Sequence, residues 1–336
     1  VFSDLNNLNV VTSTSLEYET GFGFTEEEVF TALDNLGMAE QKEIVKSWYD
    51  GFVFGTEKDI YNPWSITNYL DKKQVRAYWA DTSSNSLISR LIRKASAGIK
   101  EQMEELLQGK EIIVNFDEQI VFEQLDQDEN AIWSLMLASG YLKAEQVEYR
   151  GLLREPWYHL KITNLETTAM FTNLFKSWFN QSRTNYNQFI KALLQNDIDA
   201  MNYYMNQISM ATFSYFDVDG VEGGKSEPER FYHGFVLGLI AEQTDIYEIR
   251  SNRESGFGRY DVMMIPKKRD NCYPAVIIEF KVHNAIKEAN LEASVKAARK
   301  QIEEKNYDAE LFARGFCKEE ILHYGFAFEG KKVLIG

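Results

Sequence analysis

The sequence predicts a mixed α/β protein in which a mainly helical N-terminal part precedes a C-terminal domain of order αβββαβ. Apolar residues recur at helical spacing through much of the first half, and alternating segments at 143–147 and 157–162 predict a hairpin between helices. After a polar stretch at 217–228, short apolar runs of strand length lie between two segments of helical length. The chain of 336 residues supports more than one packed core, and the predicted domains are 1–95, 96–215 and 216–336.

Residues 25–70 are predicted to form helices joined by short connectors. Thr25 is a favoured N-cap residue and precedes three glutamates, which favour the start of a helix. Gly51 predicts where one helix stops, and Pro63 predicts where another begins. A polar loop then leads into a predicted helix at 86–94.

The middle of the chain is predicted to hold a helix, the hairpin and a second helix. The first helix covers 131–142 and ends near Gly140, and Asn164 is expected to cap the helix after the hairpin. Residues 185–207 predict one more amphipathic helix or a pair of helices. This order is compatible with a winged-helix module and equally with a helical spacer.

The C-terminal domain has a central apolar strand in which Val276, Ile277 and Ile278 predict burial on both faces. The predicted elements are a helix at 230–242, strands at 247–251, 259–265 and 275–282, a helix at 285–306, and strands at 324–329 and 332–335.

Composition limits the cellular compartments in which we expect the protein. No segment is long and apolar enough to span a bilayer, and no signal-peptide pattern is present. Two cysteines, Cys272 and Cys317, make no disulfide framework, which favours a reducing, cytoplasmic compartment. Because the first residue is Val1 and the segment resembles the inside of a domain, we expect a piece of a longer protein.

The net charge of −15 argues against a general polyanion-binding protein. The acidity is uneven, since 216–336 holds 18 basic and 21 acidic residues, and the rest holds 18 basic and 30 acidic residues. Binding to a nucleic acid is therefore plausible only locally, in the C-terminal part.

Two acidic residues and one lysine are predicted to converge in the C-terminal domain. Glu279 and Lys281 are two apart on the apolar strand, so their side chains project from one face. Asp261 lies on the strand before it. Charges at the end of a buried strand need partners, because burying a lone charge is costly.

This pattern suits a divalent metal site. Carboxylate oxygens of Asp261 and Glu279 are ligands that Mg²⁺ or Mn²⁺ prefers, and Lys281 could orient an attacking water or stabilise developing charge. The alternative is an interstrand ion pair between Lys281 and one of the two carboxylates. A third interpretation is a retained but inactive site in a binding domain.

Asp261 and the run Glu279-Phe280-Lys281 resemble the PD-(D/E)XK nuclease superfamily. The runs 232–235, 251–261 and 277–281 resemble, more specifically, the nuclease-like domain at the C-terminus of a bacterial family of AAA-ATPase-like proteins. The segments 48–54, 61–69 and 79–85 resemble the end of the ATPase-like region in that family. The resemblance covers nearly the whole chain and is most specific in the run from Asn252 to Asp261.

The resemblance implies a restriction-endonuclease-like fold, an Mg²⁺- or Mn²⁺-dependent cleavage of DNA, and products with a 5′-phosphate and a 3′-hydroxyl. It implies that Glu229 contacts the metal-bound water, with Glu242 as the alternative, and that Gln301 completes the site. Tyr307 is not assigned, because its spacing from Gln301 is longer than in some relatives. The P-loop of the ATPase is expected upstream of Val1, and Gly223-Gly224-Lys225-Ser226 is interpreted as linker.

Basic residues beside the predicted site are candidates for phosphate contacts. Arg253 and Arg259 flank the strand of Asp261, and Lys296 and Lys300 share a face of the following helix. The helix residues could equally form ordinary ion pairs on its surface.

The sequence therefore predicts a metal-dependent nuclease. The alternatives are a catalytically silent module that binds nucleic acid or protein, and a structural part of an ATPase in which the three residues form only an ion-pair network. Self-association into a homo-oligomer is left open.

Overall fold

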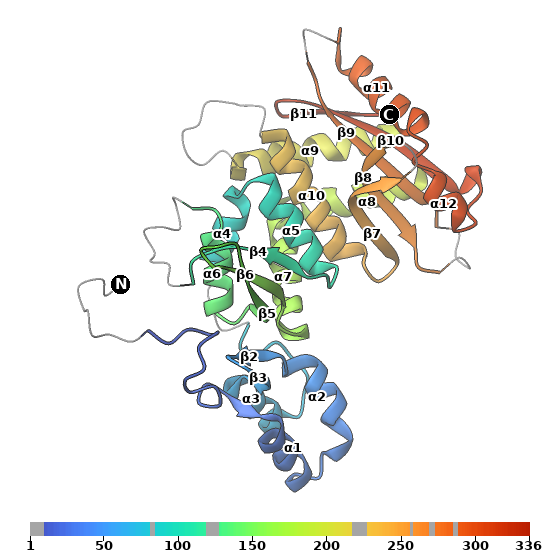
Figure 1. The fold of residues 1–336 in the computed structure, drawn as a ribbon. Coiled ribbons are helices and arrows are strands. Elements are labelled where there is room, and N and C mark those ends of the chain that lie inside the picture. The colour runs from blue at the N-terminus through green and yellow to red at the C-terminus, as the bar shows by residue number, and fades with distance from the viewer. Residues whose placement is uncertain are drawn as a thin grey trace. The chain divides into compact units, whose positions relative to one another are not determined.

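The computed structural model (Figure 1) describes residues 10–80, 85–118, 128–216, 227–255, 258–268, 273–284 and 288–336. Contacts divide the chain into two compact units, Val1–Leu174 and Phe175–Gly336. The fold class is mixed α/β, as predicted. Of the predicted linker at 217–228, residues 217–226 with the Gly-Gly-Lys-Ser run lie outside the described residues, and Glu227 and Pro228 belong to the helix that follows.

The first part of the N-terminal unit packs three helices around an aromatic core. The helices are α1 (Glu26–Asn35), α2 (Lys42–Tyr49) and α3 (Pro63–Lys72). Tyr49 and Tyr61 are fully buried at its centre. Thr25 caps α1 in a capping box with Glu28, and Asn62 caps α3, so the predicted helix starts are confirmed.

The prediction that 25–70 is helical apart from short connectors is wrong between α2 and α3. There the chain forms an antiparallel hairpin of β2 (Phe52–Phe54) and β3 (Glu57–Tyr61), with β1 (Phe24–Thr25) on the other side of β3. The strands are short, and β3 begins with three exposed charged residues that hide its alternation.

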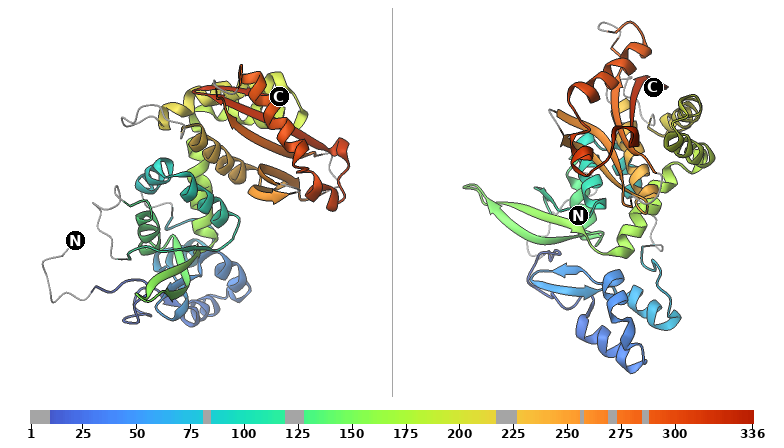
Figure 2. Two further views of the ribbon diagram at one scale, coloured as in Figure 1. Left: turned by 45° about the horizontal axis from the view of Figure 1, so that its top comes forward. Right: turned by 90° about the vertical axis from the view of Figure 1, so that its right-hand side faces the viewer.

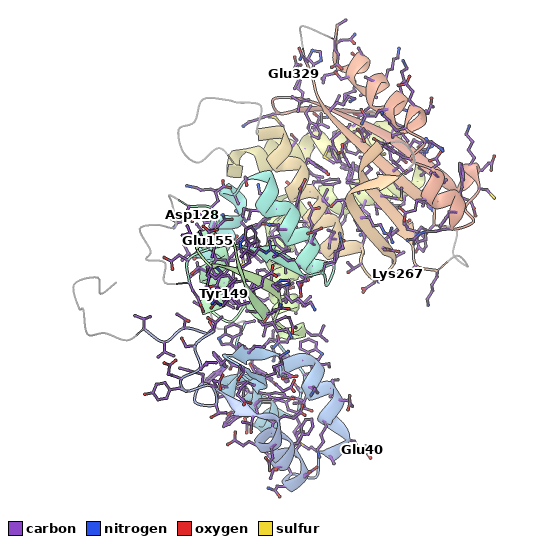
Figure 3. All side chains as sticks on the ribbon, in the orientation of Figure 1. Glu40, Asp128, Tyr149, Glu155, Lys267 and Glu329 are labelled. Carbon is purple, nitrogen blue, oxygen red and sulfur yellow. The ribbon has the colours of Figure 1, made fainter. Side chains whose placement is uncertain are left out.

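The second part of this unit contains the predicted helix and hairpin, together with two further helices and a short strand. Its elements are α4 (Ser86–Lys94), α5 (Ala97–Leu107), β4 (Ile112–Val114), α6 (Ala131–Ala138), β5 (Leu142–Arg150) and β6 (Glu155–Ile162). The sheet order is β4-β6-β5. The β5–β6 hairpin extends from the unit (Figure 2), with Tyr149 and Glu155 near its tip (Figure 3). Helix α6 ends earlier than predicted, before Gly140 with its positive φ of 74°.

Helix α7 (Leu165–Trp178) follows, and Asn164 caps it by accepting a 3.0 Å hydrogen bond from the backbone N–H of Thr167. The next predicted helix is a pair, α8 (Arg183–Gln195) and α9 (Ile198–Phe216). The helical conformation is interrupted between them at Asn196, whose φ of 56° is left-handed.

The C-terminal unit contains a five-stranded sheet of order β11-β10-β9-β8-β7 (Figure 1). Its elements are α10 (Glu227–Gln243), β7 (Tyr247–Ser255), β8 (Gly258–Pro266), β9 (Ala275–Val282), α11 (Leu291–Glu304), α12 (Ala309–Ala313), β10 (Ile321–Glu329) and β11 (Lys332–Ile335). β9 and β10 are parallel, and the other neighbours are antiparallel. The predicted order αβββαβ with a final short strand is therefore confirmed, although α11 begins only after its N-cap Asn290.

The two faces of β9 meet different layers. Ala275 and Ile277 pack in one cluster with Ile302 of α11 and Tyr307. On the other face, the Phe280 ring lies 4.2 Å from the ring of Tyr232 in α10, centroid to centroid. Because side chains alternate along a strand, the odd-numbered residues of β9 face α11.

Candidate functional site

Strand alternation places three predicted site residues on the sheet face that α11 covers. Glu279 and Lys281 continue the odd-numbered face of β9. Asp261 continues the face of β8 that carries Met263 in the same cluster. Gln301 comes from α11 itself and reaches two of these residues. The fold thus gathers four predicted site residues on one side of the sheet.

The ladder between β8 and β9 ends where the site begins. The last backbone pair is Val262 with Ile278, one position before Asp261 and Glu279 would face each other. Beyond it, the backbone N–H of Phe280 donates a 2.7 Å hydrogen bond to Oδ2 of Asp261. The Tyr232 hydroxyl donates to the Asp261 carbonyl at 3.1 Å. These bonds hold the Asp261 carboxylate beside β9.

Glu279 is a buried carboxylate with only one of its two oxygens hydrogen-bonded. Its side chain accepts a short hydrogen bond at Oε1 from Gln301 Nε2. Oε2 is buried and finds no hydrogen-bond partner in the described part of the chain. Burial raises the pKa of the Glu279 carboxyl to about 8, and the Asp261 carboxylate adds to the increase. The charge of Lys281, the nearby backbone N–H of Asp261 and the bond from Gln301 oppose it.

The Lys281 ammonium is held by an amide. Its Nζ donates a 2.8 Å hydrogen bond to Oε1 of Gln301. Among the described residues it forms no ion pair within 4.0 Å of either Asp261 or Glu279. The ammonium thus contacts this amide, and the charge of Lys281 also acts to lower the pKa of Glu279.

Gln301 links the two charged groups of β9 and also meets Tyr307. The Gln301 Nε2 lies 3.2 Å from the Tyr307 hydroxyl. The longer spacing of Tyr307 is accommodated because Asn306, with a φ of 51°, turns the chain back at the end of α11. The Tyr307 amide then bonds the Ile302 carbonyl, and its side chain is fully buried. The sequence spacing alone did not indicate this contact.

The start of α11 is also fixed to β9. His283 continues the odd-numbered face beyond Lys281, and its Nδ1 lies 2.9 Å from the hydroxyl of buried Ser294. Ser294 in turn donates a short hydrogen bond to Glu288. These polar contacts and the bond at Gln301 attach both ends of the helix to the strand that carries the site.

The residues present fit a divalent cation. Hard carboxylate oxygens are the ligands that Mg²⁺ and Mn²⁺ prefer. A buried carboxylate oxygen without a hydrogen bond is costly unless another ligand completes it, and Oε2 of Glu279 is such an atom. Asp261 and Glu279 are the residues that could hold the ion.

The remaining predicted residues have different outcomes. The side chains of Glu229, Arg253 and Arg259 lie outside the described part of the structure. Lys296 and Lys300 are exposed on α11. Lys300 pairs with Glu304 at 3.2 Å, whereas Lys296 has no ion pair in the described part. The other candidate for the helix glutamate, Glu242, lies 3.9 Å from the ammonium of Lys176.

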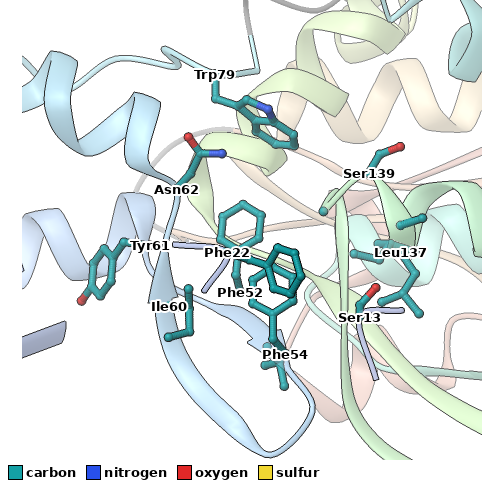
Figure 4. Close-up of a pocket in the computed structure, with 14 residues that line it drawn as sticks. Ser13, Phe22, Phe52, Phe54, Ile60, Tyr61, Asn62, Trp79, Leu137 and Ser139 are labelled. Atoms are coloured by element: carbon teal, nitrogen blue, oxygen red, sulfur yellow. The ribbon is translucent and has the colours of Figure 1, made fainter. Parts of the chain in front are cut away.

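A separate pocket of about 180 Å³ lies in the N-terminal unit (Figure 4). Aromatic and aliphatic side chains, including Phe52, Phe54 and Trp79, dominate its lining, with a few hydroxyl and amide groups. Its lining contains no carboxylate, imidazole or cationic side chain, so it offers no acid–base or metal chemistry.

Two comparisons with known proteins give matches. Residues 227–336 match the PD-(D/E)XK nuclease superfamily. An uncharacterised protein in the vnfD 5′ region of Azotobacter chroococcum mcd 1 is 25% identical over 169 residues, which are 50% of this chain and 30% of that protein. The chain thus spans about 30% of the length of this relative.

No solved structure matches the chain. In the described residues, no helix combines the length and apolarity needed to cross a membrane. The sheet topology and the match agree on the same segment. The C-terminal part of this chain carries a PD-(D/E)XK nuclease superfamily domain.

Proposed function

We propose that the C-terminal domain is a metal-dependent nuclease that hydrolyses phosphodiester bonds of DNA. The observation that carries the proposal is the Glu279 carboxylate, whose buried Oε2 has no hydrogen-bond partner in the described residues and lies beside Asp261. A carboxylate buried this way is suited to a cation ligand and unsuited to a purely structural role. The superfamily match of the same segment supports this interpretation.

Asp261 and Glu279 would hold one Mg²⁺ or Mn²⁺ ion. The ion, when bound, supplies charge stabilisation at the phosphate and lowers the pKa of water. Lys281 would orient the attacking water, with its ammonium kept in place by the 2.8 Å bond to Gln301. Gln301 would fix the relative positions of Lys281 and Glu279, because one amide group bonds both. Glu229 remains the predicted contact to the metal-bound water.

DNA is the proposed substrate by resemblance, and the candidate phosphate contacts are basic residues on the strands and the helix that carry the site. Lys296 is exposed on α11 and has no ion pair among the described residues, so it is available to a phosphate. Arg253 and Arg259 are the predicted contacts on β7 and β8. The products expected by resemblance carry a 5′-phosphate and a 3′-hydroxyl.

The wider setting is also a proposal from the resemblance. Residues 1–95 would belong to an AAA-ATPase-like region and 96–215 to a winged-helix-like middle region, in a bacterial cytoplasmic protein. The strand order β4-β6-β5 supports the second assignment. Homo-oligomerisation, which the sequence leaves open, is addressed by measuring mass in solution.

The test is cleavage of single-stranded and double-stranded DNA by the full chain with Mn²⁺. We expect cleavage that Lys281→Ala reduces by about 10²- to 10³-fold, because the variant loses the ammonium that orients the attacking water and stabilises developing charge. Lys305→Ala, on an exposed lysine of the same unit, is the control. DNA binding without cleavage by the unchanged chain would favour the silent binding module instead.

A further inference from the structure

The N-terminal unit gathers three carboxylates at one point, in a part of the chain that the superfamily match does not cover. Glu26 is the first residue of α1, Asp50 is the C-cap of α2, and Asp59 lies in β3. One carboxylate oxygen from each residue lies within 4.8 Å of the other two. Three separate elements therefore converge through acidic side chains, and no sequence spacing indicated it.

The cluster carries more negative charge than its surroundings neutralise. In the described part of the chain, Lys46 is the only cation that pairs with these carboxylates. Its ammonium contacts Glu26 closely and lies 3.7 Å from Asp59 and 4.0 Å from Asp50. One positive charge thus faces three negative charges. Carboxylates this close repel one another unless a shared proton or further positive charge lies between them, and burial and Asp59 raise the pKa of the Asp50 carboxyl to about 7.

Asp50 provides a second, independent observation. The residue is only 9% exposed, and its Oδ1 is buried without a hydrogen-bond partner. Its ion pair with Lys46 is long, and the nearest carboxylates repel it. A buried carboxyl oxygen without a hydrogen bond is costly and suits a ligand that the protein atoms do not supply.

The other two carboxylates are held in place for the same purpose. The fully buried Tyr61 donates its hydroxyl to Oε2 of Glu26 at 3.2 Å. Asp59 is half exposed, with a side-chain exposure of 51%, so one side of the cluster is open to solvent. An ion could therefore enter from the Asp59 side and reach the buried Asp50.

We propose that Glu26, Asp50 and Asp59 bind one divalent cation that prefers oxygen ligands, such as Mn²⁺, Mg²⁺ or Ca²⁺. The ion competes with the Lys46 ammonium for the same position. It connects the start of α1, the end of α2 and β3, so it stabilises the N-terminal unit. This site is separate from the proposed nuclease site and does not rest on nuclease activity.

The test is calorimetric titration of the full chain with Mn²⁺ in a background of Asp261→Asn and Glu279→Gln. That background removes the two proposed nuclease ligands, so the remaining binding reports on the N-terminal cluster. We expect binding of one ion, and we expect Asp59→Asn to weaken it by at least about tenfold. Asparagine tolerates the left-handed backbone at this position, where φ is 57°, so the variant should fold.

Two further variants make the result decisive. Lys46→Gln removes the competing ammonium and should tighten Mn²⁺ binding by several-fold. Asp34→Asn, at an exposed carboxylate that pairs with Lys42 at 2.7 Å, is the matched control and should change nothing. The proposal is overturned if the background chain binds no Mn²⁺, or if Asp59→Asn and Glu26→Gln both bind it unchanged. It is also overturned if Lys46→Gln unfolds at a lower Tm that Mn²⁺ does not raise, because the ammonium would then be the permanent partner.

Discussion

Glu166 in the N-terminal unit and Glu279 in the C-terminal unit are both buried glutamates with raised pKa values, yet their surroundings differ. The Glu166 carboxylate accepts a 2.8 Å bond from the Ser65 hydroxyl at Oε2 and a 2.7 Å bond from the Trp79 amide at Oε1. In the part of the chain that the structure describes, Oε1 of Glu279 accepts from Gln301, and Oε2 is buried without a hydrogen-bond partner. Both oxygens of the Glu166 carboxylate therefore have hydrogen-bond donors from the protein, whereas Oε2 of Glu279 has none among the described residues.

The difference shows how a buried carboxylate with a structural role can be distinguished from one that is suited to bind a ligand. Burial raises the pKa of the Glu166 carboxyl, and bonds from Ser65 and from the backbone at Trp79 oppose the increase. At Glu279, Asp261 adds a repulsion that raises the pKa further. A carboxylate that is buried, incomplete and next to another carboxylate costs stability in the absence of a ligand.

The largest expected effect separates the two residues by activity. Glu279→Gln should lower DNA cleavage by about 10³-fold, because it removes a proposed metal ligand and hence the charge stabilisation at the phosphate. Glu166→Gln should leave the cleavage rate per folded molecule unchanged. Steady-state cleavage with Mn²⁺ measures both. Equal losses in the two variants would contradict the distinction.

The free energy of unfolding should respond in the opposite way to activity, with the larger loss in Glu166→Gln. Glu166→Gln places amide hydrogens against groups that donate hydrogen bonds, and it should lower the free energy of unfolding by about 3 kcal/mol. Above pH 8, where the Glu279 carboxyl is charged, Glu279→Gln removes a buried charge and should keep or raise the stability of the metal-free chain. Urea titrations followed by circular dichroism provide the comparison. A larger loss at Glu279 than at Glu166 would reverse our interpretation.

The pH dependence sharpens the comparison further. The folded-state pKa of Glu279 is about 8, above its ordinary value of 4.5, so its contribution to stability is present at low pH and is lost as pH rises from 4.5 to 8. Metal binding needs the charged form, so Mn²⁺ affinity should fall by about tenfold per pH unit below 8. Calorimetry at three pH values tests the slope, and Lys281→Ala, which removes an opposing charge, should move the bend to higher pH.

A smaller effect is expected at the amide that bridges the site. Gln301→Ala should lower cleavage by about 10- to 100-fold, because Lys281 and Glu279 lose their shared partner. Gln301 acts through these residues and is a positioning residue, so kcat should fall more than KM rises. Tyr307→Phe, which removes only one contact of Gln301, is the matched variant and should have less effect.

The smallest effects belong to the exposed face of α11. Lys296→Ala should weaken DNA binding about twofold to fivefold. It should also reduce the slope of the logarithm of the binding constant against the logarithm of the salt concentration by about one, because one fewer counterion is released. Lys300→Ala should do less, since its ammonium already pairs with Glu304. Fluorescence anisotropy at several salt concentrations distinguishes the two. Equal effects would show that the pair with Glu304 does not compete with DNA.

Strands with a strong apolar pattern could be predicted from the sequence, and weakly patterned ones could not. The strand Ala275–Val282 was predicted at both ends, because five buried residues in a row leave few alternatives. The hairpin of Phe52–Phe54 and Glu57–Tyr61 was missed, because Glu57 to Asp59 look like a solvated loop. Local pattern carries the information for buried elements and loses it where a strand is short and exposed.

The candidate sites show the same limit at the level of side chains. Asp261, Glu279 and Lys281 could be placed together from strand alternation, because they lie on neighbouring strands. Gln301 was named from resemblance, and its bridging bonds depend on how α11 sits on the sheet. The cluster of Glu26, Asp50 and Asp59 joins three elements whose contacts no periodicity encodes.

Gly325 on β10 allows α11 to pack close to the sheet, and this packing determines where the Gln301 side chain lies in the site. A Cβ there would lie 2.7 Å from the Val295 carbonyl oxygen and 3.0 Å from the Ala298 Cβ. Any larger residue must push α11 away from β10, and the amide of Gln301 moves with that helix. Natural variants and engineered libraries should therefore tolerate changes on the outer face of α11 far better than a single methyl group at Gly325.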